Sequence, residues 1–159
     1  MKLVSSMVAA IAMLGAANIA LADSTREEPP PKQAVTGVTL ASAQQKIDAG
    51  DYRGAIPILS DFIKANPDNA DALNLMGFSL RKTGQTDLAL QYYNKALALM
   101  PKHLGANEYL GELYVELGQM DKAKERLAVL QAACGNCEQE RDLTAFIAKG
   151  PGPQKGAWR

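Results

Sequence analysis

The sequence predicts an all-α fold, an α-solenoid in which three helix–turn–helix units stack and a last helix caps the stack. Two observations support this. Ala, Leu, Gln, Lys and Glu are abundant, while aromatic residues make up only 6% of the 159 residues, a composition that favours helices over strands. Glycines also recur at a constant interval, at positions 50, 84 and 118. A period of about 34 residues is typical of stacked helical repeats.

Other positions keep the same step, and each has a role in a pair of helices. The glycine ends the first helix in a left-handed conformation that residues with a Cβ adopt reluctantly. An alanine then marks a close crossing of two helices, a bulky residue fills the groove beside the next unit, and a proline closes the second helix. In chain order these positions are Ala55, Ala89 and Ala123; Leu59, Tyr93 and Leu127; and Pro67 and Pro101, with Gly135 in the third place.

The period places the units at about 36–69, 70–103 and 104–137, followed by a capping helix at 138–149. The folded domain is therefore expected to span residues 37–149. In the second unit, the apolar side of the first helix is expected to hold Leu73, Met76, Phe78 and Leu80, and that of the second helix Leu88, Ala89, Tyr92, Tyr93, Ala96, Leu97 and Leu99.

Residues 1–22 have the features of a signal peptide. Lys2 gives a positive start, the stretch from Leu3 to Leu21 is mostly apolar or small, and Ala20 and Ala22 are the small residues that a signal peptidase reads. An uncleaved anchor is the alternative, because about 20 apolar residues span a bilayer. The cleavage pattern favours removal after Ala22, with the mature protein in the periplasm or secreted and not held in the membrane.

The segments on either side of the domain have the composition of disordered chain. Residues 23–36 are polar and contain three consecutive prolines, so we expect a disordered linker, and residues 150–159 are expected to form a flexible tail. The charges of the whole chain balance, with 17 basic and 17 acidic residues. This balance favours neither a nucleic-acid partner nor an anionic membrane surface.

Cys134 and Cys137 are the one feature of the sequence that suggests chemistry. In an exported chain such a pair is expected to form a local disulfide, which would fix the angle of the capping helix. Redox exchange is one alternative, because Cys137 near a helix start would have a lowered thiol pKa. Metal binding is another, although His103 is the only histidine and lies upstream in the preceding inter-repeat turn. We predict no metal or other cofactor.

The second unit resembles the tetratricopeptide repeat, matching its small residues and proline at Gly77, Ala89, Tyr93, Ala96 and Pro101. The resemblance covers residues 37–135. The third unit departs from it at Asn107, where the family prefers Trp or Leu, and the first half of the first unit is degenerate. The turn and last helix are similar to those of small exported repeat proteins of alphaproteobacteria, at Cys134, Cys137, Glu138, Leu143 and Ile147.

The resemblance implies a groove lined by the first helices of the repeats. Carried onto this sequence, the groove residues are Leu40, Gln44 and Ile47; Asp71, Asn74, Phe78 and Arg81; and Glu108, Glu112 and Val115. One branch of the family grips the carboxylates of chaperone tails with Lys, Arg and Asn. The corresponding positions here are Leu40, Gln44, Leu75, Gly105 and Tyr109, so that clamp is absent.

These patterns favour a protein-binding function without catalysis. We find no nucleophile elbow and no Gly-rich phosphate loop, and we expect His103 to be an ordinary exposed turn residue. The leading hypothesis is a periplasmic interaction module or assembly adaptor that binds a peptide or helix of apolar and partly basic character. The alternative is a thiol-disulfide or metal-handling accessory protein that uses Cys134 and Cys137.

Overall fold

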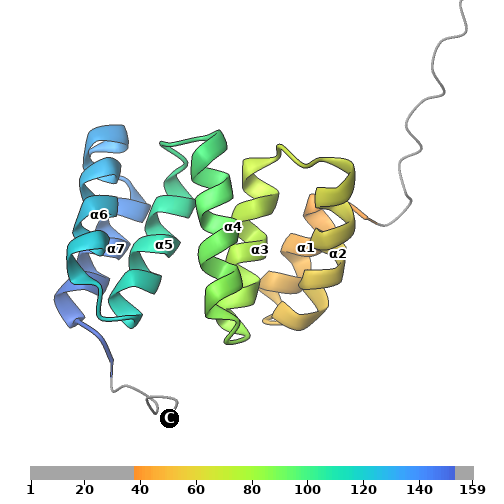
Figure 1. Ribbon diagram of the computed structural model, residues 1–159, viewed down its shortest axis with the longest axis horizontal. Helices are drawn as coiled ribbons and strands as arrows, with labels where there is room; N and C mark the ends of the chain where they lie inside the picture. The colour runs from red at the N-terminus through yellow and green to blue at the C-terminus, as the bar shows by residue number, and fades with distance from the viewer. Residues whose placement is uncertain (1–37, 153–159) are drawn as a thin grey trace, which may run out of the picture. The chain divides into compact units, whose positions relative to one another are not determined.

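The computed structural model describes residues 38–152, in which seven helices and no strands are found (Figure 1). The predicted signal peptide, the predicted linker at residues 23–36, residue 37 and residues 153–159 of the predicted tail lie outside the described residues. Three helix pairs are followed by a single helix. The pairs are α1 (Leu40–Asp48) with α2 (Tyr52–Ala65), α3 (Ala70–Lys82) with α4 (Thr86–Leu99), and α5 (Leu104–Glu116) with α6 (Met120–Cys134); the last helix is α7 (Glu138–Lys149).

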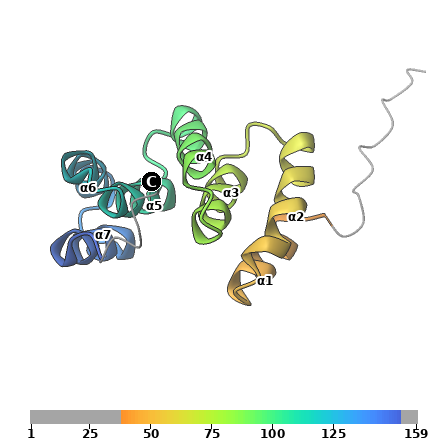
Figure 2. The ribbon, with the colours of Figure 1, turned by 60° about the horizontal axis from the view of Figure 1, so that its bottom comes forward.

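The helices are arranged as a stack in which each contacts the next along the chain. The first helices of the pairs also contact one another, α1 with α3 and α3 with α5, whereas α2, α4 and α6 make no such contacts among themselves. Helix α7 contacts both α5 and α6, so it takes the place that the first helix of a fourth pair would have (Figure 2). The predicted fold class, a solenoid of three helix pairs with a capping helix, is confirmed.

Local capping explains where the helices begin and end. Gly50, Gly84 and Gly118 follow α1, α3 and α5 and have φ angles of 74°, 82° and 72°, the left-handed region that favours glycine. Asn69 and His103, which hold equivalent positions one repeat apart, precede α3 and α5. Each side chain accepts a hydrogen bond from the backbone N–H three residues later.

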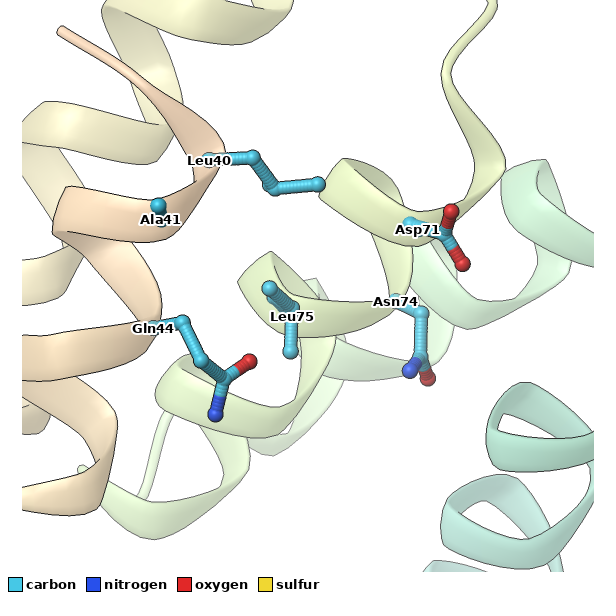
Figure 3. Close-up of a pocket in the computed structure, with 6 residues that line it drawn as sticks. All are labelled: Leu40, Ala41, Gln44, Asp71, Asn74 and Leu75. Atoms are coloured by element: carbon cyan, nitrogen blue, oxygen red, sulfur yellow. The ribbon is translucent and has the colours of Figure 1, made fainter.

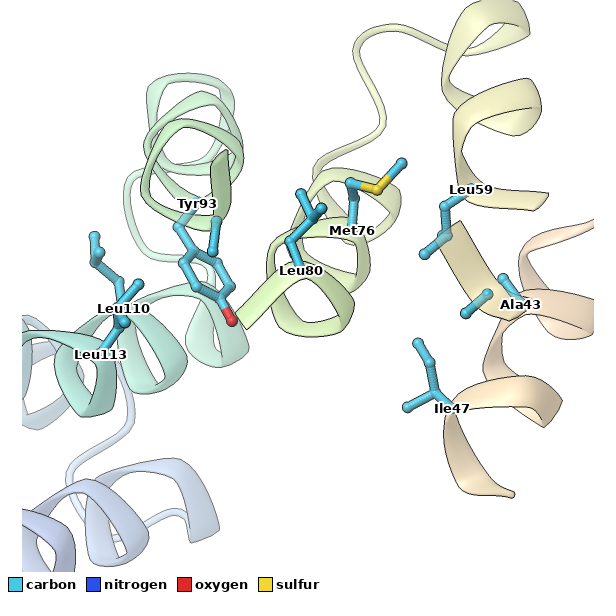
Figure 4. Packing of buried hydrophobic residues seen from close by; sticks show 10 residues of the cluster. Ala43, Ile47, Leu59, Met76, Leu80, Tyr93, Leu110 and Leu113 are labelled. Atoms are coloured by element: carbon cyan, nitrogen blue, oxygen red, sulfur yellow. The ribbon is translucent and has the colours of Figure 1, made fainter. Parts of the chain in front are cut away.

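The core lies between the helices, both within and between pairs, and includes most of the predicted repeat positions. Ala55, Ala89 and Ala123 are fully buried, as are Leu59 and Tyr93. The close view in Figure 4 shows how larger side chains fill the spaces between the helices. Its labelled residues are Ala43, Ile47, Leu59, Met76, Leu80, Tyr93, Leu110 and Leu113.

One small, buried residue recurs at the same repeat position in each first helix, and we call it the notch position: Ala43, Gly77 and Gly111. A Cβ added to Gly77 would lie 2.7 Å from the ring of Tyr93, which α4 of the same pair supplies. A Cβ added to Gly111 would lie 2.5 Å from Cδ2 of Leu143, which comes from α7. The capping helix therefore completes the third pair by packing into its notch.

The core differs from prediction in helix α4. The sequence pattern places Leu88 and Leu99 on the apolar side, but the two residues are 43% and 45% exposed. Ala89, Tyr93 and Ala96 define the buried stripe, and Leu88 lies about 100° around the helix from Ala89. Within residues 38–152, no helix is long and apolar enough to cross a bilayer.

Removing the side chain that fills the third notch should loosen the capping helix. Leu143 is fully buried, so Leu143→Ala is expected to lower the free energy of unfolding by about 2–4 kcal/mol, as urea denaturation would measure. The matched control is Leu88→Ala, the same substitution at an exposed helical leucine, which should change stability by less than about 0.5 kcal/mol. Equal effects of the two variants would contradict this packing.

Candidate functional site

The structure distributes the predicted groove residues over three places along the first helices. Leu40, Gln44, Asp71 and Asn74 line one hollow between α1 and α3. Phe78 lies in a row of aromatic rings. Arg81, Glu108 and Glu112 form a charged cluster where α7 meets α5. Ile47 and Val115 instead belong to the core, with exposed fractions of 9% and 0%.

The hollow has a volume of about 340 Å³ and combines apolar and polar walls (Figure 3). Leu40, Ala41 and Leu75 supply apolar atoms, while Gln44, Asp71 and Asn74 supply polar ones. Two of the positions that correspond to the chaperone-tail clamp of the family, Leu40 and Leu75, are therefore apolar walls here.

His103 differs from the exposed turn residue that the sequence predicts. It is only 9% exposed and is the N-cap of α5, where its Nδ1 accepts a hydrogen bond from the N–H of Ala106 at 3.0 Å. Its Nε2 lies 2.9 Å from Oδ1 of Asp71. Because Nδ1 is an acceptor, the neutral ring carries its proton on Nε2 and donates to Asp71. The pair links the start of α5 to the edge of the hollow.

An aromatic row, defined as Tyr52, Phe78 and Tyr109, crosses from the start of α2 over α3 to α5. The ring centroids of Tyr52 and Phe78 are 5.8 Å apart in an edge-to-face arrangement, and those of Phe78 and Tyr109 are 4.7 Å apart. All three side chains are half-buried, so they remain partly accessible. The ammonium group of Lys82 lies 5.2 Å from the Phe78 ring centroid, within range of a cation–π contact.

Arg81 is held by two carboxylates of the next repeat. Its side chain is 5% exposed, its Nη1 donates to Glu112 at 2.5 Å, and its Nε and Nη2 donate to the two oxygens of Glu116 at 3.0 and 2.6 Å. Burial alone would lower the pKa of Arg81, but the hydrogen bonds to Glu116 and Glu112 raise it above its usual value. Arg81 and Glu112 thus form an internal ion pair between α3 and α5.

Glu108 is a buried carboxyl group, 7% exposed, with no hydrogen bond in the described structure. Burial raises its pKa first, and the nearby carboxylates of Glu112, Asp142 and Glu138 raise it further, to about 8 against a usual 4.5. Arg81 opposes this only in part. The carboxyl group is therefore mostly protonated at neutral pH.

Helix α7 covers the third-repeat end of the surface that the first helices α1, α3 and α5 form. It packs against α5, with Leu143 in the notch at Gly111, three residues after Glu108. The Phe146 ring centroid lies 5.8 Å from Cζ of Arg81. The structure thus differs from the prediction that Arg81 and Glu108 are open to a partner. Asn74 is also buried, with 6% exposed.

Cys134 and Cys137 are joined by a disulfide across the turn between α6 and α7. This turn also contains Gly135, at a φ of 71°. In the part of the chain that the structure describes, no group of three His, Cys, Asp or Glu side chains is placed to hold a metal ion.

Sequence reasoning missed Tyr52, Glu116 and the pairing of His103 with Asp71. Glu116 could have been found, because an arginine in one first helix and two glutamates four residues apart in the next form a pattern of facing charges. Tyr52 was missed because it is the first residue of α2, the second helix of a pair, and the predicted groove contains residues of first helices only. The hydrogen bond of His103 depends on the geometry of an inter-repeat turn.

The stacked pairs, the left-handed glycines at a fixed step and the partly open face of first helices define a helical repeat protein. Two family models described as tetratricopeptide repeat match the sequence, at residues 40–103 and 80–143. Together they run through all three helix pairs. The chain belongs to the tetratricopeptide-repeat family.

Curated relatives share the repeat region with this chain. The human general transcription factor 3C polypeptide 3 is 34% identical over 86 residues, which are 54% of this chain and 10% of that protein. The tetratricopeptide repeat and J domain-containing co-chaperone DNJ1 of Fusarium oxysporum is 26% identical over 145 residues, 89% of this chain and 28% of its own length. The chain thus spans only a small part of the relatives it matches.

Solved structures show the same fold at low identity. The first TPR of Spaghetti (RPAP3), bound to the HSP90 peptide SRMEEVD, superposes with a TM-score of 0.62 at 17% identity, covering 69% of this chain and 86% of that one. The second TPR domain of human RPAP3, in complex with the HSP70 peptide SGPTIEEVD, gives 0.61 at 18% identity, covering 68% and 90%.

The buried carboxyl of Glu108 should make stability depend on pH. Because its folded pKa of about 8 is above its usual 4.5, the folded state holds a proton that the unfolded state loses, and stability falls as pH rises from about 4.5 to about 8. Glu108→Gln should abolish this decline. The variant is expected to exceed the wild type by about 1–3 kcal/mol above pH 8 and to match it near pH 4.5.

Thermal denaturation between pH 4.5 and 9 would measure the difference. Glu125→Gln is the matched control, because the Glu125 side chain is 67% exposed on α6. Its pH profile should follow that of the wild type. A Glu108→Gln profile parallel to the wild type would mean that the carboxyl group is ionised in the folded protein.

Proposed function

We propose that this protein is a non-enzymatic interaction module that binds a peptide or helix of a partner protein. The observation that carries the proposal is that the hollow and the aromatic row are neighbours on the first helices. These two features lie side by side on α3, since Asp71, Asn74 and Leu75 line the hollow and Phe78 follows one turn later. Partly exposed aromatic rings next to a hollow are the type of anchor site that dominates binding energy in protein interfaces.

The structural neighbours support the general mode of binding but suggest a different ligand. Both RPAP3 domains hold peptides that end in Glu-Glu-Val-Asp. In this chain the carboxylate of Asp71 lies at the hollow, and its side chain is 72% exposed. An acidic peptide tail would be repelled there. The proposed partner segment is therefore apolar, with aromatic or aliphatic anchors, and carries basic rather than acidic side chains.

We further propose that the module works in the periplasm, or outside the cell, after cleavage of residues 1–22. A disulfide between Cys134 and Cys137 supports such a location, because disulfides persist in oxidising compartments. There the protein would act as an assembly adaptor, since the hollow and the aromatic row form a surface suited to holding another protein.

Replacing Phe78 with alanine should weaken partner capture at least tenfold, because it removes the central ring of the aromatic row. The measurement is cross-linking capture from envelope extract followed by quantitative mass spectrometry, comparing the wild type with the variant. Leu88→Ala is the control, because it removes an exposed side chain from α4.

A thermal melt must show that the Phe78 variant is folded. If it is not, Phe78→Leu keeps an apolar side chain there and removes only the aromatic ring. Unchanged capture by a folded Phe78 variant would place the partner on another face of the molecule.

Export predicts a specific new chain start. When the full-length chain is expressed in a Gram-negative host, the protein from the periplasmic fraction should begin at Asp23, and mass spectrometry of the intact protein would show this. Ala22→Asp places a charged residue at the cleavage site and should leave the precursor uncleaved. Full-length protein recovered with the cytosol would overturn the proposed location.

A further inference from the structure

The hollow between α1 and α3 has a chemical character that the aromatic row lacks. Its polar side chains, Gln44, Asp71 and Asn74, are one carboxylate and two carboxamides, and among residues 38–152 no Lys or Arg side chain lines it. Its apolar walls come from Leu40, Ala41 and Leu75, as Figure 3 shows. A ligand that suits this hollow supplies hydrogen-bond donors and a positive charge, and it also has an apolar part that covers the apolar walls.

The contacts of Asp71 leave part of its carboxylate available to a ligand. One oxygen, Oδ1, accepts the hydrogen bond from Nε2 of His103 at 2.9 Å. The other has no partner among the described residues. His103 is itself fixed by the bond that its Nδ1 accepts from the Ala106 N–H, so the carboxylate is held in place at the hollow.

Only one of the two carboxamides offers an accessible acceptor oxygen. Asn74 is more than nine-tenths buried, and its Oδ1 has no hydrogen-bond partner among the described residues but is itself enclosed by protein atoms. The amide nitrogen of Gln44 donates a hydrogen bond to Oδ1 of Asp48 at 2.8 Å. The carboxamide oxygen of Gln44 therefore remains available as an acceptor. A ligand rich in hydrogen-bond donors fits this set, whereas an anion would meet the charge of Asp71.

We propose that the hollow binds a basic side chain of the partner, arginine in preference to lysine. The aliphatic stem packs against Leu40 and Leu75, while the cationic head pairs with Asp71 and donates to the carboxamide oxygen of Gln44. Arginine is preferred because its guanidinium group directs five N–H donors in several directions, as separated acceptors require. This inference rests on the proposed peptide-binding function and specifies one residue of the partner.

The test uses N-acetyl-arginine amide as the probe and N-acetyl-norleucine amide as an uncharged analogue that keeps an aliphatic stem. In two-dimensional ¹H–¹⁵N NMR of the protein, the side-chain amide signals of Gln44 and Asn74 report directly on the hollow. Arginine amide should shift both signals saturably, with a dissociation constant on the order of millimolar for a single side chain. Norleucine amide should bind at least about fivefold more weakly, because it forms no ion pair.

Asp71→Asn should weaken the arginine probe about fivefold or more. Asp87→Asn is the matched control, because Asp87 has the same place in the first turn of α4 as Asp71 has in α3, and it should leave binding unchanged. The backbone spectrum shows whether each variant is folded. Should Asp71→Asn not fold, Gln44→Leu on the other wall removes an acceptor and should also reduce binding of the arginine probe.

Three outcomes would overturn the inference: no saturable shift with arginine amide, equal binding of norleucine amide, or full binding of arginine amide by the folded Asp71 variant. Failure here is distinguishable from failure of the proposed function. If the arginine probe does not bind but capture still depends on Phe78, only the assignment of an arginine side chain to the hollow is overturned. Arginine binding without Phe78-dependent capture overturns the proposed partner face.

Discussion

The packing of a large side chain against the small notch position of a first helix is the contact on which the rest of the structure depends. In the second pair the second helix supplies this side chain, Tyr93, and the equivalent Leu59 of the first pair is, like Tyr93, fully buried. The equivalent residue of the third pair, Leu127, is only half-buried. The atoms nearest the Gly111 notch belong to Leu143 of α7. The capping helix is therefore part of the packing of the third repeat.

The position of α7 decides which part of the first-helix layer a partner can reach. By packing along α5, α7 closes the end of the face where Glu108 lies and brings Phe146 next to Arg81. Helix α7 does not line the hollow between α1 and α3, and the side chains of the aromatic row stay partly accessible. A surface that the repeat pattern treats as one groove is thus divided into an internal interface and a candidate binding site.

Much of the fold followed from the sequence, because the repeat period constrains local structure directly. A glycine that must adopt a positive φ, such as Gly84, and an alanine at a helix crossing, such as Ala89, are visible without coordinates. The site was predicted less completely. The burial of Glu108 depends on how α7 crosses α5, and that crossing follows from side-chain sizes at two positions far apart in sequence. The fixed position of Asp71 likewise depends on a histidine one repeat away.

The charge that a partner meets also depends on packing and not on the number of acidic residues. The sequence pattern places the acidic character of the face on the third repeat, at Glu108 and Glu112. In the structure Glu112 is paired with Arg81, and the pKa of Glu108 is raised to about 8, so neither presents a free negative charge at neutral pH. The carboxylate of Asp71, whose side chain is 72% exposed, lies at the hollow instead. The proposed preference for a basic partner therefore rests on the second repeat and not on the third.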